Sequence, residues 1–109
     1  MAASALSASV GKPIIIAQAA TTDSAIVRDA FPGYNYAPTA DYALLEDAVR
    51  RARASQLRAH VGNILSSDIF YHADGLKAYE AWMAHGVLGV EMEAAALYTL
   101  CARFGARAL

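Results

Sequence analysis

Cysteine is almost absent from this chain. Cys101 is the single cysteine among 109 residues, which excludes an internal disulfide and any zinc site built from several thiolates. Because Cys101 falls in an apolar stretch with helical spacing, we expect it to be a small buried hydrophobic residue. A chain without disulfides has no need of an oxidising compartment, so a reducing, cytoplasmic setting is expected.

Long apolar runs and targeting signals are also missing. No segment approaches the roughly 18–20 uninterrupted apolar residues that span a bilayer. Residues 1–10 lack both the basic start and the continuous apolar core of a signal peptide. Yet 57% of the residues are hydrophobic, and the mean hydropathy is +0.28. These values predict a chain that packs against another subunit or against further parts of its own fold.

The chain carries no excess of positive charge. Its formal net charge is −1, whereas a nucleic-acid surface needs a clustered positive excess. In the only arginine-rich stretch, Glu46 and Asp47 each precede an arginine by four residues, which is the favoured spacing for an ion pair on one helix. We therefore expect a solvated helix face there and no nucleic-acid partner.

Residue patterns that hold metals, phosphate loops or serine nucleophiles are absent. The histidines, His60, His72 and His85, do not have the spacing of metal ligands. No serine lies in the G-x-S-x-G context of a hydrolase nucleophile, and there is no glycine-rich phosphate loop. We expect neither a metal nor a cofactor.

The chain instead contains an alternation of short apolar runs and helical patterns. Predicted strands lie at 13–17, 59–65 and 87–90, and predicted helices at about 41–57, 76–84 and 92–104. The first run is apolar at consecutive positions, which favours a strand covered on both faces. The segments between the predicted elements include a loop at 28–38, and the last residues, 106–109, look like the beginning of a further strand. Such alternation predicts a layered α/β sheet.

The predicted helices have recognisable ends and faces. Thr39 or Asp41 is expected to cap the first and longest helix, because both side chains can accept a hydrogen bond from the first turn. In the short middle helix, we expect Leu76, Tyr79 and Met83 to be buried on one face.

The densest cluster of candidate functional residues occupies 89–96, where an apolar strand turns into a helix. Ligand crevices of α/β sheets open outside the carboxyl ends of strands. Glu91 and Glu93 flank Met92 there. An ionised carboxylate can accept hydrogen bonds from two neighbouring sugar hydroxyls, and methionine offers a polarizable apolar contact. The alternative is that acids at a helix N-terminus only complement the helix dipole. Spacing alone does not decide between these interpretations.

A second cluster, residues 66–71, follows the second predicted strand. Phe70 and Tyr71 are adjacent aromatic residues, and aromatic rings can stack on a planar base. In the alternative interpretation, Asp68 caps a turn and the two rings fill a gap in the core. Both interpretations remain open at the level of local sequence.

The string GVLGVEMEAAALY, from Gly86 to Tyr98, resembles the nucleoside phosphorylase family of purine and uridine phosphorylases and their nucleosidase relatives. It is most similar to the bacterial, hexameric type of purine nucleoside phosphorylase. Residues 20–24, 37–42 and 61–71 are similar to other segments of that family, in the same order. Several matching segments make the resemblance specific.

The resemblance implies a fold and a domain division. The fold would be a layered α/β/α sandwich with a mixed central sheet, incomplete in this chain. Residues 13–109 would be a partial phosphorylase domain that carries its central and nucleoside-binding part. Residues 1–12 would be a low-complexity segment, most of which matches nothing recognised. A sheet that lacks its further strands would expose edges and apolar faces, so we expect the chain to associate.

The resemblance also implies roles for individual residues. Glu93 would hold the ribose 2′- and 3′-hydroxyls, and Met92 would pack against the sugar. Valine at position 90 and the lack of a uracil-reading glutamine–arginine motif favour a purine. Phe70 would flank this base, and the other residues lining its pocket would be Val90, Glu91, Tyr71 and Ser67.

The implied activity is phosphorolysis of purine (deoxy)nucleosides to the free base and (deoxy)ribose 1-phosphate. The partners would be a purine nucleoside, inorganic phosphate as co-substrate and further copies of the chain, since the family forms hexamers. The family's phosphate-binding segments and the acid that protonates the leaving purine are not found in this sequence. The alternatives are a nucleosidase, or a non-catalytic fragment that only binds nucleosides or packs on a homologue.

Overall fold

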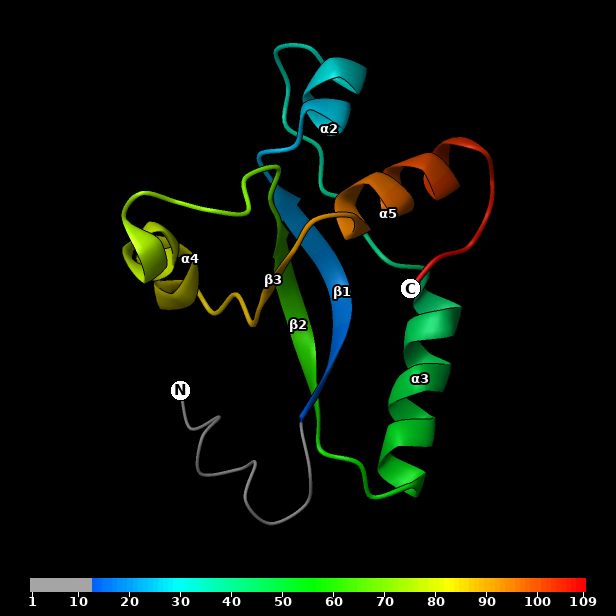
Figure 1. The fold of residues 1–109 in the computed structure, drawn as a ribbon. Coiled ribbons are helices and arrows are strands. Elements are labelled where there is room, and N and C mark those ends of the chain that lie inside the picture. The colour runs from blue at the N-terminus through cyan, green and yellow to red at the C-terminus, as the bar shows by residue number, and fades with distance from the viewer. Residues whose placement is uncertain (1–12) are drawn as a thin grey trace.

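A computed structural model describes residues 13–109, so the predicted low-complexity segment, residues 1–12, lies outside the described residues. The described chain alternates strands with helices, as Figure 1 shows. In order, the elements are β1 (Ile14–Thr22), α2 (Ala25–Ala30), α3 (Tyr42–Ala54), β2 (Ala59–Ser66), the 3₁₀ helix η1 (Gly75–Tyr79), α4 (Glu80–Ala84), β3 (Val90–Glu91) and α5 (Ala94–Arg103). The predicted α/β class is confirmed.

The three described strands form one parallel sheet in the order β1–β2–β3. β1 and β2 pair along their length, with one register shift near the middle of β1. β3 pairs only with the end of β2, where Val90 lies opposite Leu65. Because the strands are parallel, their carboxyl ends lie at the same edge of the sheet, at Thr22, Ser66 and Glu91.

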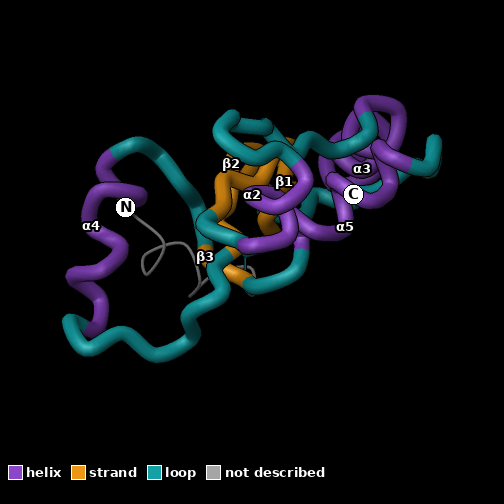
Figure 2. The backbone as a smooth tube through the Cα atoms, turned by 90° about the horizontal axis from the view of Figure 1, so that it is seen from above, coloured by secondary structure: helices purple, strands orange, loops and turns teal. Residues whose placement is uncertain are grey.

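The family resemblance implies a mixed sheet, which contains antiparallel as well as parallel pairs. Within the described residues, one antiparallel contact is present. It is an isolated bridge between Ala19 in β1 and Thr39 in the loop before α3. Helices lie on both sides of the strands: Figures 1 and 2 show α3 and α5 on one side and α4 on the other. α2 lies beyond the carboxyl end of β1 (Figure 1). This is the layered arrangement that the sequence predicts.

The core lies between the sheet and α5, and small side chains allow the two to approach closely. Ala95 is fully buried and Ala20 nearly so. Tyr98 is 3% exposed, and its hydroxyl donates a hydrogen bond of 2.8 Å to the carbonyl of Ala17 in β1. Cys101, predicted to be buried, is partly buried and packs against the same cluster.

The first strand differs from its prediction in length and burial. β1 continues to Thr22 instead of ending at residue 17, because it pairs with β2 as far as Ser66. Ile14 and Ile15 are exposed, so the expectation of a strand covered on both faces is wrong for this run.

Two further element boundaries differ from the sequence prediction. The segment predicted to be a loop from residue 28 begins inside a helix, α2, whose six residues are too few to show helical periodicity. Ser24 caps this helix through a hydrogen bond from the amide of Ile26. The third strand is displaced toward the C-terminus, since only Val90 and Glu91 have strand geometry.

The predicted burial of the middle helix is largely wrong. Leu76 is 82% exposed and Met83 is 52% exposed, while Tyr79 is only partly covered. The segment folds as a 3₁₀ turn followed by a five-residue α-helix, so its apolar residues do not form one continuous stripe. The last residues, predicted to begin a strand, have no regular structure. Within them, Ala108 accepts a backbone hydrogen bond from Asp41.

Asp41 rather than Thr39 caps the longest helix. Its carboxylate accepts a hydrogen bond of 3.0 Å from the amide of Leu44, in the first turn of α3. We expect Asp41→Ala to lower the free energy of unfolding by about 1 kcal/mol, the usual cost of losing such a cap. Urea denaturation would measure it. Asp41→Ser should restore most of the loss, and an unchanged midpoint for Asp41→Ala would contradict the assignment.

Candidate functional site

The structure joins the two candidate clusters at the carboxyl edge of the sheet. Ser67 directly follows β2, and its amide donates a hydrogen bond of 2.9 Å to the carbonyl of Glu91 at the end of β3. Met92 and Glu93 connect β3 to α5. Segments more than 20 residues apart in the sequence therefore present their candidate side chains at one place.

Glu93 and Met92 are accessible from solvent. Met92 is 39% exposed, and Glu93 is also exposed. Glu93 occupies the N-cap position of α5, but its side chain makes no capping hydrogen bond there. The Glu93 carboxylate has no hydrogen bond or ion pair with any residue in the described range 13–109. Its carboxylate is thus available to a ligand. The alternative, that acids here only complement the dipole of α5, fits Glu91, whose carboxylate accepts amides at the start of the helix. Glu93 makes no such hydrogen bond.

The carboxylate of Glu91 is directed at the chain itself. One oxygen, Oε2, accepts hydrogen bonds from the amides of Glu93 at 2.6 Å and Ala94 at 2.7 Å. The other, Oε1, accepts a hydrogen bond from the hydroxyl of Ser66. The Ser66 hydroxyl also accepts the amide of Ala95 at 2.9 Å. Glu91 therefore satisfies amide groups at the start of α5 that have no partner within the helix.

Ser67, the residue after Ser66, is hydrogen-bonded to a polar side chain in the segment that follows β1. It is 2% exposed, and its hydroxyl donates a hydrogen bond of 3.3 Å to Asp23. Asp23 also accepts the amide of Asp68 at 3.1 Å, while Asp68 accepts the amide of Ala25 at 3.0 Å. These two aspartates tie the ends of β1 and β2 together. Asp23 is not among the candidate residues, although its position in a cluster of turn-forming residues is a signal for such a contact.

Phe70 and Tyr71 lie in the loop after β2 and face solvent. Phe70 is 65% exposed and Tyr71 is 87% exposed. Their rings meet edge to face, with centroids 4.6 Å apart. The interpretation in which these rings fill a gap in the core is therefore wrong, because neither is buried. Both rings are free to stack on a planar ligand.

An apolar cleft of about 210 Å³ lies beside this edge, between β3 and the α4 segment. Of the candidate residues, Val90 lines it, and this side chain is 47% exposed. The remaining lining residues are mainly hydrophobic: Leu65, Leu76, Tyr79, Trp82, Met83, Val87, Leu88 and Gly89. The cleft thus offers an apolar surface next to the segment that carries Met92 and Glu93.

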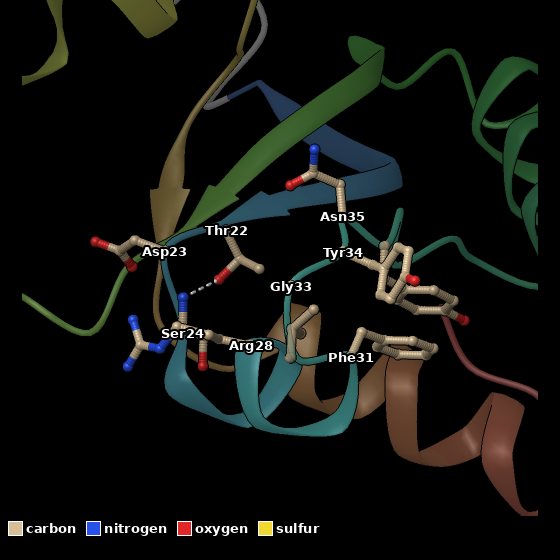
Figure 3. Close-up of a pocket in the computed structure, with 10 residues that line it drawn as sticks. Thr22, Asp23, Ser24, Arg28, Phe31, Gly33, Tyr34 and Asn35 are labelled. Atoms are coloured by element: carbon tan, nitrogen blue, oxygen red, sulfur yellow. Dashed lines mark hydrogen bonds between the residues drawn. The ribbon is translucent and has the colours of Figure 1, made fainter.

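A second cleft, of about 490 Å³, lies between the end of β1 and the loop after α2 (Figure 3). Its walls include the stacked rings of Phe31 and Tyr36, whose centroids are 4.3 Å apart. In Figure 3 the side chain of Asp23 points away from this cleft. None of the seven candidate residues lines it, so it is separate from the candidate site.

Within residues 13–109, no group of three or more acidic, histidine or cysteine side chains could hold a metal ion. In the same part of the chain, no helix has the length and apolar content needed to cross a bilayer.

A parallel sheet flanked by helices defines an α/β protein, a class in which ligand crevices open at the carboxyl edge of the sheet, where the exposed acidic and aromatic residues lie. The chain matches the phosphorylase superfamily over residues 3–109. It therefore belongs to the phosphorylase superfamily, which confirms the family resemblance seen at residues 86–98.

Curated relatives include proteins named "Purine nucleoside phosphorylase DeoD-type". That of Caldanaerobacter subterraneus subsp. tengcongensis is 48% identical over 98 residues, which cover 90% of this chain and 42% of the relative. That of Roseobacter denitrificans is 51% identical over 98 residues, with the same two shares. That of Geobacillus kaustophilus is 47% identical over 98 residues, 41% of its length. This chain thus spans about two fifths of the length of these relatives.

Proposed function

We propose that this chain is the nucleoside-binding part of a purine nucleoside phosphorylase, and that the whole protein converts purine (deoxy)nucleosides and phosphate to the free base and (deoxy)ribose 1-phosphate. The observation that carries the proposal is the exposed Glu93 carboxylate, which has no partner among residues 13–109 and lies beside Met92 at the carboxyl edge of the sheet. Relatives about half identical to the chain are purine nucleoside phosphorylases by name, which supports the same substrate class.

The chemistry of the reaction explains what these residues would contribute. Phosphate attacks the anomeric carbon as the glycosidic bond loosens, and positive charge develops on the sugar. Catalysis then depends on positioning and on electrostatic stabilisation, without a covalent intermediate on the protein. In the proposal, Glu93 accepts hydrogen bonds from the 2′- and 3′-hydroxyls, and Met92 packs against the sugar. Contacts to phosphate, and the acid that protonates the leaving base, are assigned to no residue of this chain.

The base would be held by apolar and aromatic groups. Phe70 would stack on one face of the purine, with Tyr71 beside it, and Val90 would form part of the pocket wall. The exposure of both rings and the apolar cleft next to Val90 support this placement. Ser67 is buried and hydrogen-bonded to Asp23. It would therefore contribute to the pocket by holding in place the loop that carries the two rings.

We extend the proposal to a homo-oligomer in the cytoplasm. Several large apolar side chains of the sheet are exposed in the single chain, among them Ile14, Ile15 and Val61. Apolar surface of this kind favours burial against another copy. The single cysteine, which excludes an internal disulfide, supports a reducing compartment.

Titration of the chain with nucleosides tests the proposal. We expect adenosine and inosine to bind saturably and to shift the amide signals of Phe70, Met92 and Glu93 in ¹⁵N-correlated NMR spectra, whereas uridine should bind more weakly. Absence of binding, or shifts confined to other parts of the chain, would contradict the proposal.

Analysis of the reaction products separates phosphorolysis from the nucleosidase alternative, because release of base without phosphate would indicate hydrolysis.

A further inference from the structure

The start of α5 is held by two side chains that precede it on the sheet. The first amides of a helix have no partner within the helix and must be satisfied from outside. Here, the amides of Glu93, Ala94 and Ala95 are all satisfied, the first two by Glu91 and the third by Ser66. The cap therefore comes from the ends of β3 and β2, not from the N-cap residue itself.

Ser66 ties this cap to the central strand of the described sheet. Its side chain is 1% exposed, and both hydrogen-bonding functions of its hydroxyl are used, one to accept the Ala95 amide and one to donate to Glu91. Ser66 and Glu91 are also direct neighbours in the register of β2 and β3. A buried hydroxyl that is fully hydrogen-bonded has little freedom to reorient, so it fixes the Glu91 carboxylate as well.

These contacts hold the backbone from which the Glu93 side chain extends. The Glu93 amide is bonded directly to Glu91, which immobilises the backbone from which the Glu93 side chain departs. The Glu91 carboxylate is turned toward the amides of α5 and the Glu93 carboxylate is exposed, so the two acids have different environments. A binding group presented on an ordered backbone loses less entropy when its ligand arrives.

We propose that Glu91 and Ser66 are positioning residues, which hold the first turn of α5 so that Glu93 faces the two hydroxyls of the nucleoside sugar. This inference rests on the proposed function, because it concerns the same sugar site. It differs from the role in the base pocket that the family resemblance implies for Glu91. Oε2 of Glu91 already accepts two hydrogen bonds from the chain and Oε1 accepts one, so the carboxylate has little accepting capacity left for the base.

Amide hydrogen exchange tests the cap without any ligand. In Glu91→Ala, the amides of Glu93 and Ala94 should exchange at least tenfold faster than in the wild type, while amides in the middle of α3 should not change. Glu91→Gln should keep most of the protection, because its carbonyl oxygen can replace Oε2. Unchanged exchange in Glu91→Ala would overturn the proposal.

Nucleoside binding tests the action through Glu93. The probes are adenosine and 2′,3′-dideoxyadenosine, which lacks both hydroxyls, and calorimetry gives the two affinities. We expect Glu91→Ala to weaken adenosine about tenfold, roughly the upper end of the cost of ordering one side chain, and to leave dideoxyadenosine unchanged. Glu91→Gln should restore adenosine binding, and adding Glu91→Ala to Glu93→Ala should cost nothing further. If Glu91→Ala does not fold, Ser66→Ala removes the other side chain of the cap. This variant should also weaken adenosine and leave dideoxyadenosine unchanged.

The outcomes separate the inference from the function on which it rests. Equal weakening of adenosine and dideoxyadenosine by Glu91→Ala would mean that Glu91 contacts the base, and would overturn the inference alone. A wild-type chain that binds adenosine and dideoxyadenosine equally would refute the proposed sugar site itself. Glu46→Ala, which removes an exposed carboxylate from α3, is the control for charge and should change neither affinity.

Discussion

Replacing Glu93 with alanine is expected to weaken adenosine binding about a hundredfold. The proposed contact consists of two hydrogen bonds from sugar hydroxyls to one carboxylate, and hydrogen bonds to charged groups each contribute about 1.5–3 kcal/mol. A hundredfold loss corresponds to about 2.7 kcal/mol, slightly below the lower end of that sum, which is about 3 kcal/mol. Because the Glu93 side chain makes no hydrogen bond within residues 13–109, its removal leaves no protein group unpaired. Calorimetric titration of the variant measures the effect.

The matched control for this prediction is again Glu46→Ala. It removes the same charge from an exposed position on α3, on the outer part of the molecule, and should leave binding unchanged. Thermal unfolding of both variants should follow that of the wild type. In addition, 2′-deoxyadenosine should lose only about half of the free energy that Glu93→Ala removes, since one hydroxyl remains. Equal effects of the Glu93 and Glu46 substitutions would refute the assignment of Glu93 to the sugar.

The fold could be predicted where local patterns are strong. The strand at 59–65 and the helix that begins after Asp41 are present within one or a few residues of their predicted bounds, because β-branched runs and an amphipathic stripe with a cap are local signals. α2 and β3 were missed or displaced because six-residue and two-residue elements leave too little pattern. Their bounds depend on tertiary contacts, such as the pairing of Val90 with Leu65.

The candidate site was predictable as a set of segments but not as a set of contacts. Two acids on a turn into a helix need not face the same way, and the structure shows Glu91 hydrogen-bonded to the chain and Glu93 exposed. No local pattern shows that Ser66 is the partner of Glu91, because that contact joins residues 25 positions apart. The link between Asp23 and Ser67 spans 44 positions and depends equally on strand register.

Replacing Tyr98 with alanine should have the largest effect on stability. Its ring is 3% exposed in the cluster that joins α5 to the sheet, and truncating a buried aromatic side chain to alanine costs about 3–5 kcal/mol. That is a large share of the roughly 5–15 kcal/mol that stabilises a typical domain. We therefore expect Tyr98→Ala to be largely unfolded at 37 °C by circular dichroism. Tyr98→Phe, which loses only the hydrogen bond to Ala17, should cost about 1 kcal/mol.

The same residue gives stability a defined dependence on alkaline pH. Burial raises the pKa of Tyr98 above its ordinary value of 10.0, and the negative charge of Glu91 raises it further. The folded chain therefore holds the phenol proton more tightly than the unfolded chain. The resulting stabilisation is fully present below pH 10 and is lost as the pH rises from there through the pKa of the folded state. Urea denaturation between pH 8 and about 11 should show a steeper fall for the wild type than for Tyr98→Phe, whereas parallel curves would mean that Tyr98 does not titrate differently in the two states.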